Sequence, residues 1–270
     1  MTLTLNGAAG DQLLDIQNQL DDRGIPIDEV GISGLRYPVV FDDGELSQSV
    51  IADLEITVGL PADRRGTHMS RMVQAADTHL QVINPREFAA ALKILADLLD
   101  ASTARVSAAL PVAVRVAAPT SGQEAWQVHD VHLRGDLSDD SYTLETTVSV
   151  DVTTLCPCSK AISDYGAHNQ RSRVSLTVQG SGDAAYPVPV STLIEIIRAN
   201  SSCPVFPVVK RPDERAVTMA AYDKPMFVED LLRDVSGQCR ALELAHRVEA
   251  RNIESIHSHD AVARLSWTPS

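Results

Sequence analysis

Cysteine and aromatic residues are scarce in this sequence. Its 270 residues include four cysteines, and phenylalanine, tryptophan and tyrosine together make up 4% of the chain. Four unevenly spaced cysteines are too few for the disulfide framework of a secreted protein, and nothing in the sequence suggests an oxidising compartment. We therefore expect the thiols of Cys156, Cys158, Cys203 and Cys239 to be free or bound to a metal.

Basic residues are also in deficit, and long apolar runs are absent. The chain has 23 lysine and arginine residues against 36 aspartate and glutamate residues, which gives a formal net charge of −13. Nucleic-acid binding needs a basic face, so we expect no nucleic-acid partner, and a phosphate-bearing substrate would need a local cluster of cations. No apolar run approaches the ~20 residues that span a bilayer, and the first residues lack the order of a secretory signal. We expect a cytoplasmic protein without a membrane partner.

Apolar residues make up 44% of the chain, which is ample for a buried core. Their spacing switches between period 2 and period 3.6, which is typical of alternating strands and helices. In the first half we expect strands over residues 29–41, 49–60, 104–119 and 124–135, and helices over 67–80 and 85–100. In the second half we expect strands over 141–155, 171–179, 241–252 and 261–267, and helices over 190–200 and 224–239.

Both halves follow the order β-β-α-α-β-β, which predicts an α+β fold built from two similar units. Each unit would be a largely antiparallel sheet with helices on one face, and the two sheets would join into a larger sheet or a barrel. We expect an N-terminal arm over 1–28, a first unit over 29–137, and a second unit over 138–270 that carries most of the active site. Pro111 predicts an edge or a bulge in its strand, and Pro85 predicts the first turn of a helix.

Thiol and imidazole groups come together in the segment "CPCSKAISDYGAHNQRS", residues 156–172. Cys156 follows an alternating strand and precedes a proline, so its thiol should lie at the mouth of the sheet. A thiolate with the imidazole of His168 suits zinc or another divalent transition metal, provided that a third ligand comes from elsewhere. Two alternatives are buried structural cysteines beside a turn histidine, and a nucleophilic thiol of Cys156 or Cys158 activated by His168 or Lys160.

Two later segments add carboxylates and imidazoles. In "KRPDERAVTMAAYDKPMFVEDLLRDV", residues 210–235, we expect Glu214 to emerge from a loop and Glu229 to lie in the first turn of a helix. Taken alone, Glu214 could be an exposed loop carboxylate, and Glu229 could simply stabilise a helix N-terminus. The segment "NIESIHSHDAVARL" should bring three further groups into the last pair of strands, namely Glu254, His257 and His259.

Together with "RGTHMSRM", these segments resemble the type IB GTP cyclohydrolases, a bacterial and archaeal family. The matching segments follow the family's order from about residue 65 to the last strand, and the first thirty residues carry no resemblance. The resemblance implies the tunnelling fold, with two fused β-β-α-α-β-β units in each subunit, and a homotetramer with active sites at subunit boundaries. It places the metal ligands on Cys156, His168 and Glu214, the guanine-binding carboxylate on Glu229 and the acid–base group on His257.

The resemblance implies hydrolysis of GTP at C8 of the purine, with loss of formate and formation of 7,8-dihydroneopterin triphosphate, the first step of tetrahydrofolate and pterin biosynthesis. A bound Zn²⁺, Mn²⁺ or Fe²⁺ ion would lower the pKa of a water molecule to ~7 and supply hydroxide. Cys156 and His168 would thus serve catalysis as metal ligands, while His257 would exchange protons with the ring nitrogens. Glu229 would accept hydrogen bonds from the guanine N1–H and amino group.

The triphosphate of the substrate would need a group of cations, drawn from one subunit or from several. We expect it to be bound by Lys160, His68, Arg71 and Arg171, together with Arg64 and Arg65. The ordinary alternative is that the arginines form a solvated face of the protein.

One position departs from the family pattern. Met219 stands where family members usually have the glutamate of a V-T-E sequence, close to Glu214, which leaves the surroundings of the metal in question. A paralogue of the same fold could act on another purine or pterin. A non-catalytic purine-binding protein of this fold is the third interpretation, and it predicts loss of the metal ligands, which this chain retains.

Overall fold

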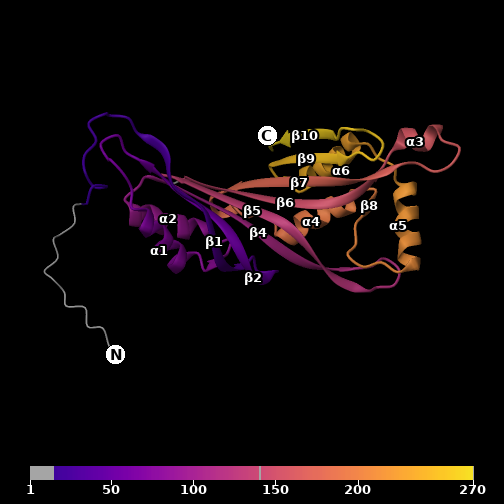
Figure 1. Ribbon diagram of the computed structural model, residues 1–270, viewed down its shortest axis with the longest axis horizontal. Helices are drawn as coiled ribbons and strands as arrows, with labels where there is room; N and C mark the ends of the chain where they lie inside the picture. The colour runs from indigo at the N-terminus through magenta and orange to yellow at the C-terminus, as the bar shows by residue number, and fades with distance from the viewer. Residues whose placement is uncertain (1–14, 140, 270) are drawn as a thin grey trace, which may run out of the picture.

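The computed structural model describes residues 15–139 and 141–269, and Figure 1 shows its elements. The strands are β1 (Ile27–Asp42), β2 (Ser47–Leu60), β3 (Val82–Ile83), β4 (Thr103–Ala117), β5 (Glu124–Ser138), β6 (Ser141–Leu155), β7 (Asn169–Ser181), β8 (Cys203–Pro204), β9 (His246–Ile253) and β10 (Ala261–Trp267). The helices are α1 (Met69–His79), α2 (Phe88–Leu99), α3 (Pro157–Ile162), α4 (Val190–Ala199), α5 (Arg211–Asp223) and α6 (Val228–Ala241), with a 3-10 turn η1 (Gly182–Ala184).

The strands form one sheet in the order β10-β9-β7-β6-β5-β4-β2-β1-β3, with β8 paired to β6. Every pair is antiparallel except β1 with β3. The long strands of the first half therefore lie together, as do those of the second half, and the β5–β6 pair joins the two sets. This arrangement confirms the expected fusion of two similar units into a larger, mostly antiparallel sheet.

Helices cover one face of this sheet, as the sequence predicts. Helix α2 packs on β4 and β5, α4 packs on β6, and α6 packs on β9 and β10. Along β6 the residues alternate between buried and half-buried, since one face lies under helices and the other does not. One apolar core runs through both halves and includes Phe41, Leu54, Leu133, Leu144 and Leu176.

Two helices that lie next to a proline differ from expectation. Residues 211–223 form α5, although Glu214 was expected to emerge from a loop. Pro212 lies in the first turn, where its missing N–H costs nothing, and the Asp213 carboxylate accepts the Lys210 N–H at 2.8 Å. In contrast, Pro85 lies in a turn before α2, which begins only at Phe88.

Pro111 lies in the part of β4 that does not pair with β2, where a residue without a backbone N–H is tolerated. Strand β4 pairs with β2 only between Ala104 and Ala109, whereas it pairs with β5 along its whole length. Pro111 follows this shorter pairing, so its missing N–H costs no bond to β2, and the expected edge position is confirmed.

The predicted arm and unit boundaries are only partly visible. Residues 1–14 of the arm lie outside the described residues, and Leu20 pairs with Arg64 in an isolated bridge. The unit boundaries after residues 28 and 137 stay predictions. No helix in the described part of the chain is long and apolar enough to cross a membrane.

Candidate functional site

A pocket of about 300 Å³ opens in the second half, where β6 ends, β7 begins, and the loop joins β9 to β10. Its walls come from four segments of the chain. They are Cys156, His168, Gln170, Met226, Phe227, Val228, Glu229, Asn252, Glu254, His257, His259 and Ala261. The pocket therefore combines a thiol, imidazoles, carboxylates and amides.

Cys156 and His168 become neighbours because the chain folds back on itself between them. Strand β6 ends at Leu155, and Cys156 caps the short helix α3, with its Sγ accepting the Ser159 N–H at 3.4 Å. The Cys156 N–H donates to the His168 carbonyl at 3.1 Å, and the His168 N–H donates to Ser159 Oγ at 3.2 Å. Both side chains are half-buried, so they remain accessible to a ligand.

Glu229 faces the pocket from the first turn of α6, as the sequence predicts. The neighbouring Asp230 caps this helix, because its Oδ2 accepts the Phe227 N–H at 3.0 Å. Within residues 15–139 and 141–269, Glu229 has no hydrogen bond or ion pair, and it is exposed. Its carboxylate is therefore free to bind a ligand.

His257 and His259 lie in the loop between β9 and β10, the last pair of strands, as the sequence predicts. Their rings stack with centroids 5.2 Å apart, and both are exposed. Glu254 lies at the start of the same loop and is half-buried. This loop therefore adds two imidazoles and a carboxylate to the mouth of the pocket.

Glu214 does not line this pocket. It is exposed in the first turn of α5, a helix where the sequence predicted a loop. Its neighbour Asp213 is buried, and the carboxylate accepts the N–H groups of Thr120 and Ser121 at 2.8 Å each and the Ser121 hydroxyl at 2.6 Å. These donors hold the pKa of Asp213 well below its ordinary value.

The donors for a metal ion are thus only partly assembled. The thiol of Cys156 and the imidazole of His168 fit a divalent transition metal and line one pocket. Across the described residues, however, no group of three histidine, cysteine, aspartate or glutamate side chains has the geometry to hold a metal ion. The predicted set of Cys156, His168 and Glu214 is therefore not brought together by this structure.

Two of the expected phosphate-binding cations lie outside the pocket. Lys160 Nζ donates to the Tyr222 carbonyl at 2.5 Å and lies 4.2 Å from the centre of the Tyr222 ring. Arg171 follows Gln170 in β7, so its side chain projects from the opposite face of the sheet, and it pairs with Asp151 at 3.7 Å.

His68 and Arg71 lie at the other end of the molecule. Together with Arg64 they line a cavity of about 120 Å³ beside α1, in the first half. The Nε2 atom of His68 is buried without a hydrogen bond in the described residues and lies 3.5 Å from the Asp15 carboxylate. Figure 1 shows α1 and α3 near opposite ends of the molecule, so one copy does not bring these cations to Cys156.

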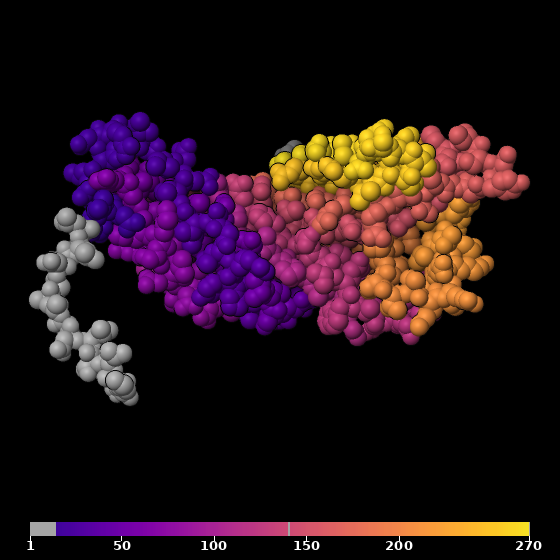
Figure 2. Space-filling view, viewed as in Figure 1, coloured from indigo at the N-terminus to yellow at the C-terminus, as the bar shows by residue number. Residues whose placement is uncertain are grey.

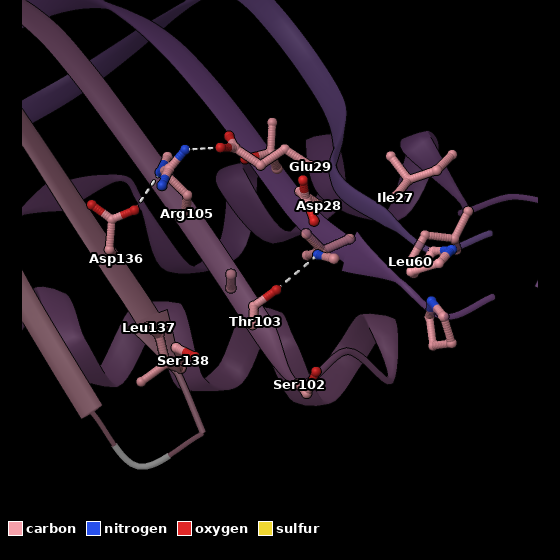
Figure 3. Close-up of a pocket in the computed structure, with 16 residues that line it drawn as sticks. Ile27, Asp28, Glu29, Leu60, Ser102, Thr103, Arg105, Asp136, Leu137 and Ser138 are labelled. Carbon is pink, nitrogen blue, oxygen red and sulfur yellow. Dashed lines mark hydrogen bonds and ion pairs between the residues drawn. The ribbon is translucent and has the colours of Figure 1, made fainter.

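Another cavity, of about 660 Å³, is lined by residues of β1, β2, β4 and β5 and of the adjoining turns in the first half (Figure 3). Arg105 lies in the wall of this cavity and forms ion pairs with Glu29 and Asp136. Thr103 Oγ1 accepts the Gly59 N–H at 3.0 Å in the same wall. Its described lining residues include no cysteine or histidine, so this cavity offers none of the predicted catalytic groups.

Gln170 and Asn252 are pocket residues that the sequence did not single out. Both are buried amides on the helix-covered face of the sheet. The only signal in the sequence is their position in the strand alternation, where a polar residue stands in place of an apolar one. Such a residue indicates a buried polar contact but not what it contacts.

Solved structures of low sequence identity share this fold. The uricase from Arthrobacter globiformis has a TM-score of 0.50 at 8% identity and covers 90% of this chain and 93% of its own. The uricase from Bacillus fastidious has a TM-score of 0.51 at 7% identity, covering 92% of this chain and 94% of its own. At these identities the likeness concerns the fold alone, and it confirms the expected tunnelling fold.

Sequence relatives are much closer. A protein named GTP cyclohydrolase FolE2 from Neisseria gonorrhoeae is 38% identical over 257 residues, which cover 94% of this chain and 98% of the relative. A protein of the same name from Bordetella petrii is 42% identical over 253 residues, which cover 92% of this chain and 94% of the relative. The family model described as "Type I GTP cyclohydrolase folE2" matches residues 13–263. The chain therefore belongs to the type I GTP cyclohydrolase folE2 family.

Proposed function

We propose that this chain is a GTP cyclohydrolase of type IB, which hydrolyses GTP at C8, releases formate and forms 7,8-dihydroneopterin triphosphate for tetrahydrofolate or pterin biosynthesis. Family membership supports the activity. The observation that carries the location of the site is the pocket that combines Cys156, His168, Glu229 and His257. These four residues come from separate segments of the chain, and each offers a group that the reaction needs.

Glu229 selects the purine. Its free carboxylate can accept two hydrogen bonds, from the guanine N1–H and from the exocyclic amino group. Adenine presents no matching pair of donors at this edge. A site built for such hydrogen bonds rejects a base that lacks them by roughly 10⁴-fold.

His257 moves protons during ring opening. Cleavage at C8 leaves a nitrogen that must be protonated, and recyclisation requires the return of protons to solvent. An imidazole can both donate and accept a proton near neutral pH. The exposed position of His257 in the β9–β10 loop, stacked on His259, gives it access to a bound purine and to water.

A divalent ion, Zn²⁺, Mn²⁺ or Fe²⁺, is the proposed cofactor, with Cys156 and His168 as ligands. When bound, such an ion lowers the pKa of a water molecule and so supplies hydroxide at neutral pH. Glu214 is the proposed third ligand, although it lies outside the pocket, in the first turn of α5 that Asp213 attaches to Thr120 and Ser121.

The triphosphate is bound with help from a second copy of the chain. His68, Arg71 and Arg64 form the cationic cavity at the far end from Cys156. A homotetramer in which this end meets the Cys156 pocket of a neighbour would complete each site at a subunit boundary. We also propose that the enzyme works in the cytoplasm, where GTP is available.

Turnover of GTP by purified, Mn²⁺- or Zn²⁺-loaded protein tests the activity, with the product identified by mass spectrometry. Glu229→Gln should reduce kcat/KM for GTP by roughly 10²- to 10⁴-fold, because one acceptor becomes a donor facing the guanine edge. Asp234→Asn, an exposed carboxylate on the same helix outside the pocket, is the matched control and should leave turnover unchanged. Equal activity of wild type and Glu229→Gln would remove Glu229 from the site, and a different purine substrate would indicate a paralogue.

A further inference from the structure

Four polar side chains are buried beneath His168, on the face of the sheet that the helices cover. They are Thr154 in β6, Gln170 and Ser172 in β7, and Asn252 in β9, with exposed fractions of 0%, 7%, 0% and 3%. The sheet register sets Thr154 opposite Gln170, and Asn252 opposite Ser172. Buried polar groups are costly unless they bond to one another, and here they do.

These side chains form a continuous row of hydrogen bonds that starts at His168. The His168 Nδ1 atom lies 3.1 Å from Gln170 Oε1, and Gln170 Nε2 lies 2.9 Å from Thr154 Oγ1. Thr154 Oγ1 lies 2.8 Å from Ser172 Oγ, which lies 2.6 Å from Asn252 Oδ1. We refer to Gln170, Thr154, Ser172 and Asn252 as the amide–hydroxyl row.

The direction of donation along this row is determined at its far end. The carbonyl oxygen of Asn252 can only accept, so the single hydroxyl proton of Ser172 is used there. The Ser172 oxygen must then accept from Thr154, and the Thr154 oxygen must accept from the amide nitrogen of Gln170. This leaves the Gln170 carbonyl oxygen facing the imidazole, where it can only accept.

We propose that the amide–hydroxyl row holds His168 in the tautomer that carries its proton on Nδ1 and presents the Nε2 lone pair to the pocket. Gln170 and Thr154 are then positioning residues, which act on the reaction only through His168. Nε2 is the ring nitrogen that has no partner in the described residues, and it is the atom left for a metal ion. The Ser255 hydroxyl, 3.3 Å from Nδ1, can accept as well, so it does not oppose this tautomer.

This inference rests on the proposed role of His168, but its test does not use turnover. Two-bond ¹H–¹⁵N spectra of the metal-free, full-length chain labelled with ¹⁵N-histidine report which ring nitrogen carries the proton. The His168 signals are identified by their loss in His168→Gln. We expect the Nδ1–H tautomer, and a dominant Nε2–H tautomer would overturn the proposal, because it requires the row to donate in the opposite direction.

Breaking the row tests the cause. Thr154→Val removes the link between Gln170 and Ser172 without changing the shape of the side chain, so both tautomers of His168 should appear. Binding of Co²⁺, followed by its absorption spectrum, should weaken by roughly 10- to 100-fold. If the single Nδ1–H tautomer and the Co²⁺ affinity persist in this variant, the row does not set the tautomer.

Two controls separate this effect from a general loss of packing. Thr154→Ser keeps the hydroxyl and should restore the single tautomer. Thr147→Val removes a hydroxyl from the same strand, one that bonds to Thr177 at 2.8 Å on the opposite face, and should leave the His168 spectrum unchanged. Should Thr154→Val not fold, Ser172→Ala breaks the next link and carries the same expectation. Failure of GTP turnover with an intact Nδ1–H signal would count against the proposed function and not against the row.

Discussion

At the scale of single residues, the chain contains pairs of adjacent carboxylates in which one holds a helix in place and the other is exposed. Asp230 caps helix α6 while Glu229, one position earlier, stays free to face the pocket. Asp213 anchors helix α5 while Glu214, one position later, is exposed to solvent. In both pairs a structural carboxylate is adjacent in sequence to one with a proposed functional role, so the two can be told apart only by their contacts.

The contacts of Asp213 predict a pH-dependent stability. Its pKa is lower in the folded chain than the ordinary 3.8, chiefly because the Ser121 hydroxyl and nearby N–H groups donate to the carboxylate. The stabilisation is therefore complete above pH 3.8 and is lost as the pH falls through the lower, folded-state pKa. Asp213→Asn should lower the free energy of unfolding at neutral pH, measured in urea, and the difference from wild type should shrink in acid. A difference that is independent of pH would contradict this account.

The four thiols should fall into two classes. Cys158 is exposed and Cys156 half-buried, whereas Cys203 and Cys239 are buried. Burial raises the pKa of Cys203, and it raises the pKa of Cys239 to about 11, so both are protonated and shielded at neutral pH. A colorimetric thiol reagent should therefore modify Cys156 and Cys158 in the native protein, and Cys203 and Cys239 only after unfolding. Rapid modification of all four in the native state would show that the core opens.

At the scale of elements, two glycines differ in how closely other atoms pack around them, and this difference can be tested. A Cβ atom at Gly180, in β7, would lie 2.3 Å from the Ala184 carbonyl oxygen and 2.6 Å from that of Ala185. Gly180→Ala should therefore destabilise the fold by about 1 to 3 kcal/mol. A Cβ atom at Gly237, inside α6, would meet no described atom within 4 Å outside its chain neighbours and the backbone of its own helix, so Gly237→Ala should stabilise the fold by about 0.5 to 1 kcal/mol. Thermal unfolding measures both, and a loss of stability at each position would contradict the packing argument.

Periodicity predicted the elements that have a clear apolar pattern and missed helices that lack one. Strand β6 and helix α4 begin where the sequence predicts, because their apolar residues follow one clear period. Helix α5 was missed because it buries only Asp213 and Ala221, so it has no apolar stripe to detect. Helix α3 has no buried residue at all. The boundaries of elements near prolines were ambiguous for a separate reason, because proline is found both at the start of helices and at the end of strands.

The sequence predicted some residues of the candidate site but not all of them. The pocket brings together Cys156, His168, Glu229 and His257, whose residue types carry recognisable chemistry. The position of Glu214 outside this pocket could not be predicted, because it depends on whether residues 211–223 form a loop or a helix. The contribution of Gln170 and Asn252 depends on strand register, which a single sequence does not determine.

At the scale of the whole molecule, the two groups of candidate ligands lie far apart. Figure 2 shows an elongated shape with the N-terminal half at one end and the orange and yellow C-terminal segments at the other. The cavity of His68 and Arg71 belongs to the first half, and the pocket of Cys156 to the second. If both groups serve one site, as we propose, that site combines two copies of the chain in the proposed homotetramer.

Mixing of variants tests this sharing of sites between subunits. His68→Ala with Arg71→Ala removes one set of groups, and Cys156→Ala removes the other, so each protein alone should lack GTP turnover. When the two are unfolded together and refolded, some sites combine an intact half from each chain and activity should return in part. If GTP turnover does not return in oligomers shown to contain both variants, the two sets of groups do not belong to one shared site.

The central claim is that the Cys156 pocket converts GTP through a bound divalent ion, and product formation by wild type and Cys156→Ala measures it most directly. Metal-loaded wild type should release formate and yield a product that oxidation and dephosphorylation turn into fluorescent neopterin. Cys156→Ala, folded to the same thermal midpoint, should yield none. Full activity in that variant, or in wild type stripped of metal, would contradict the account.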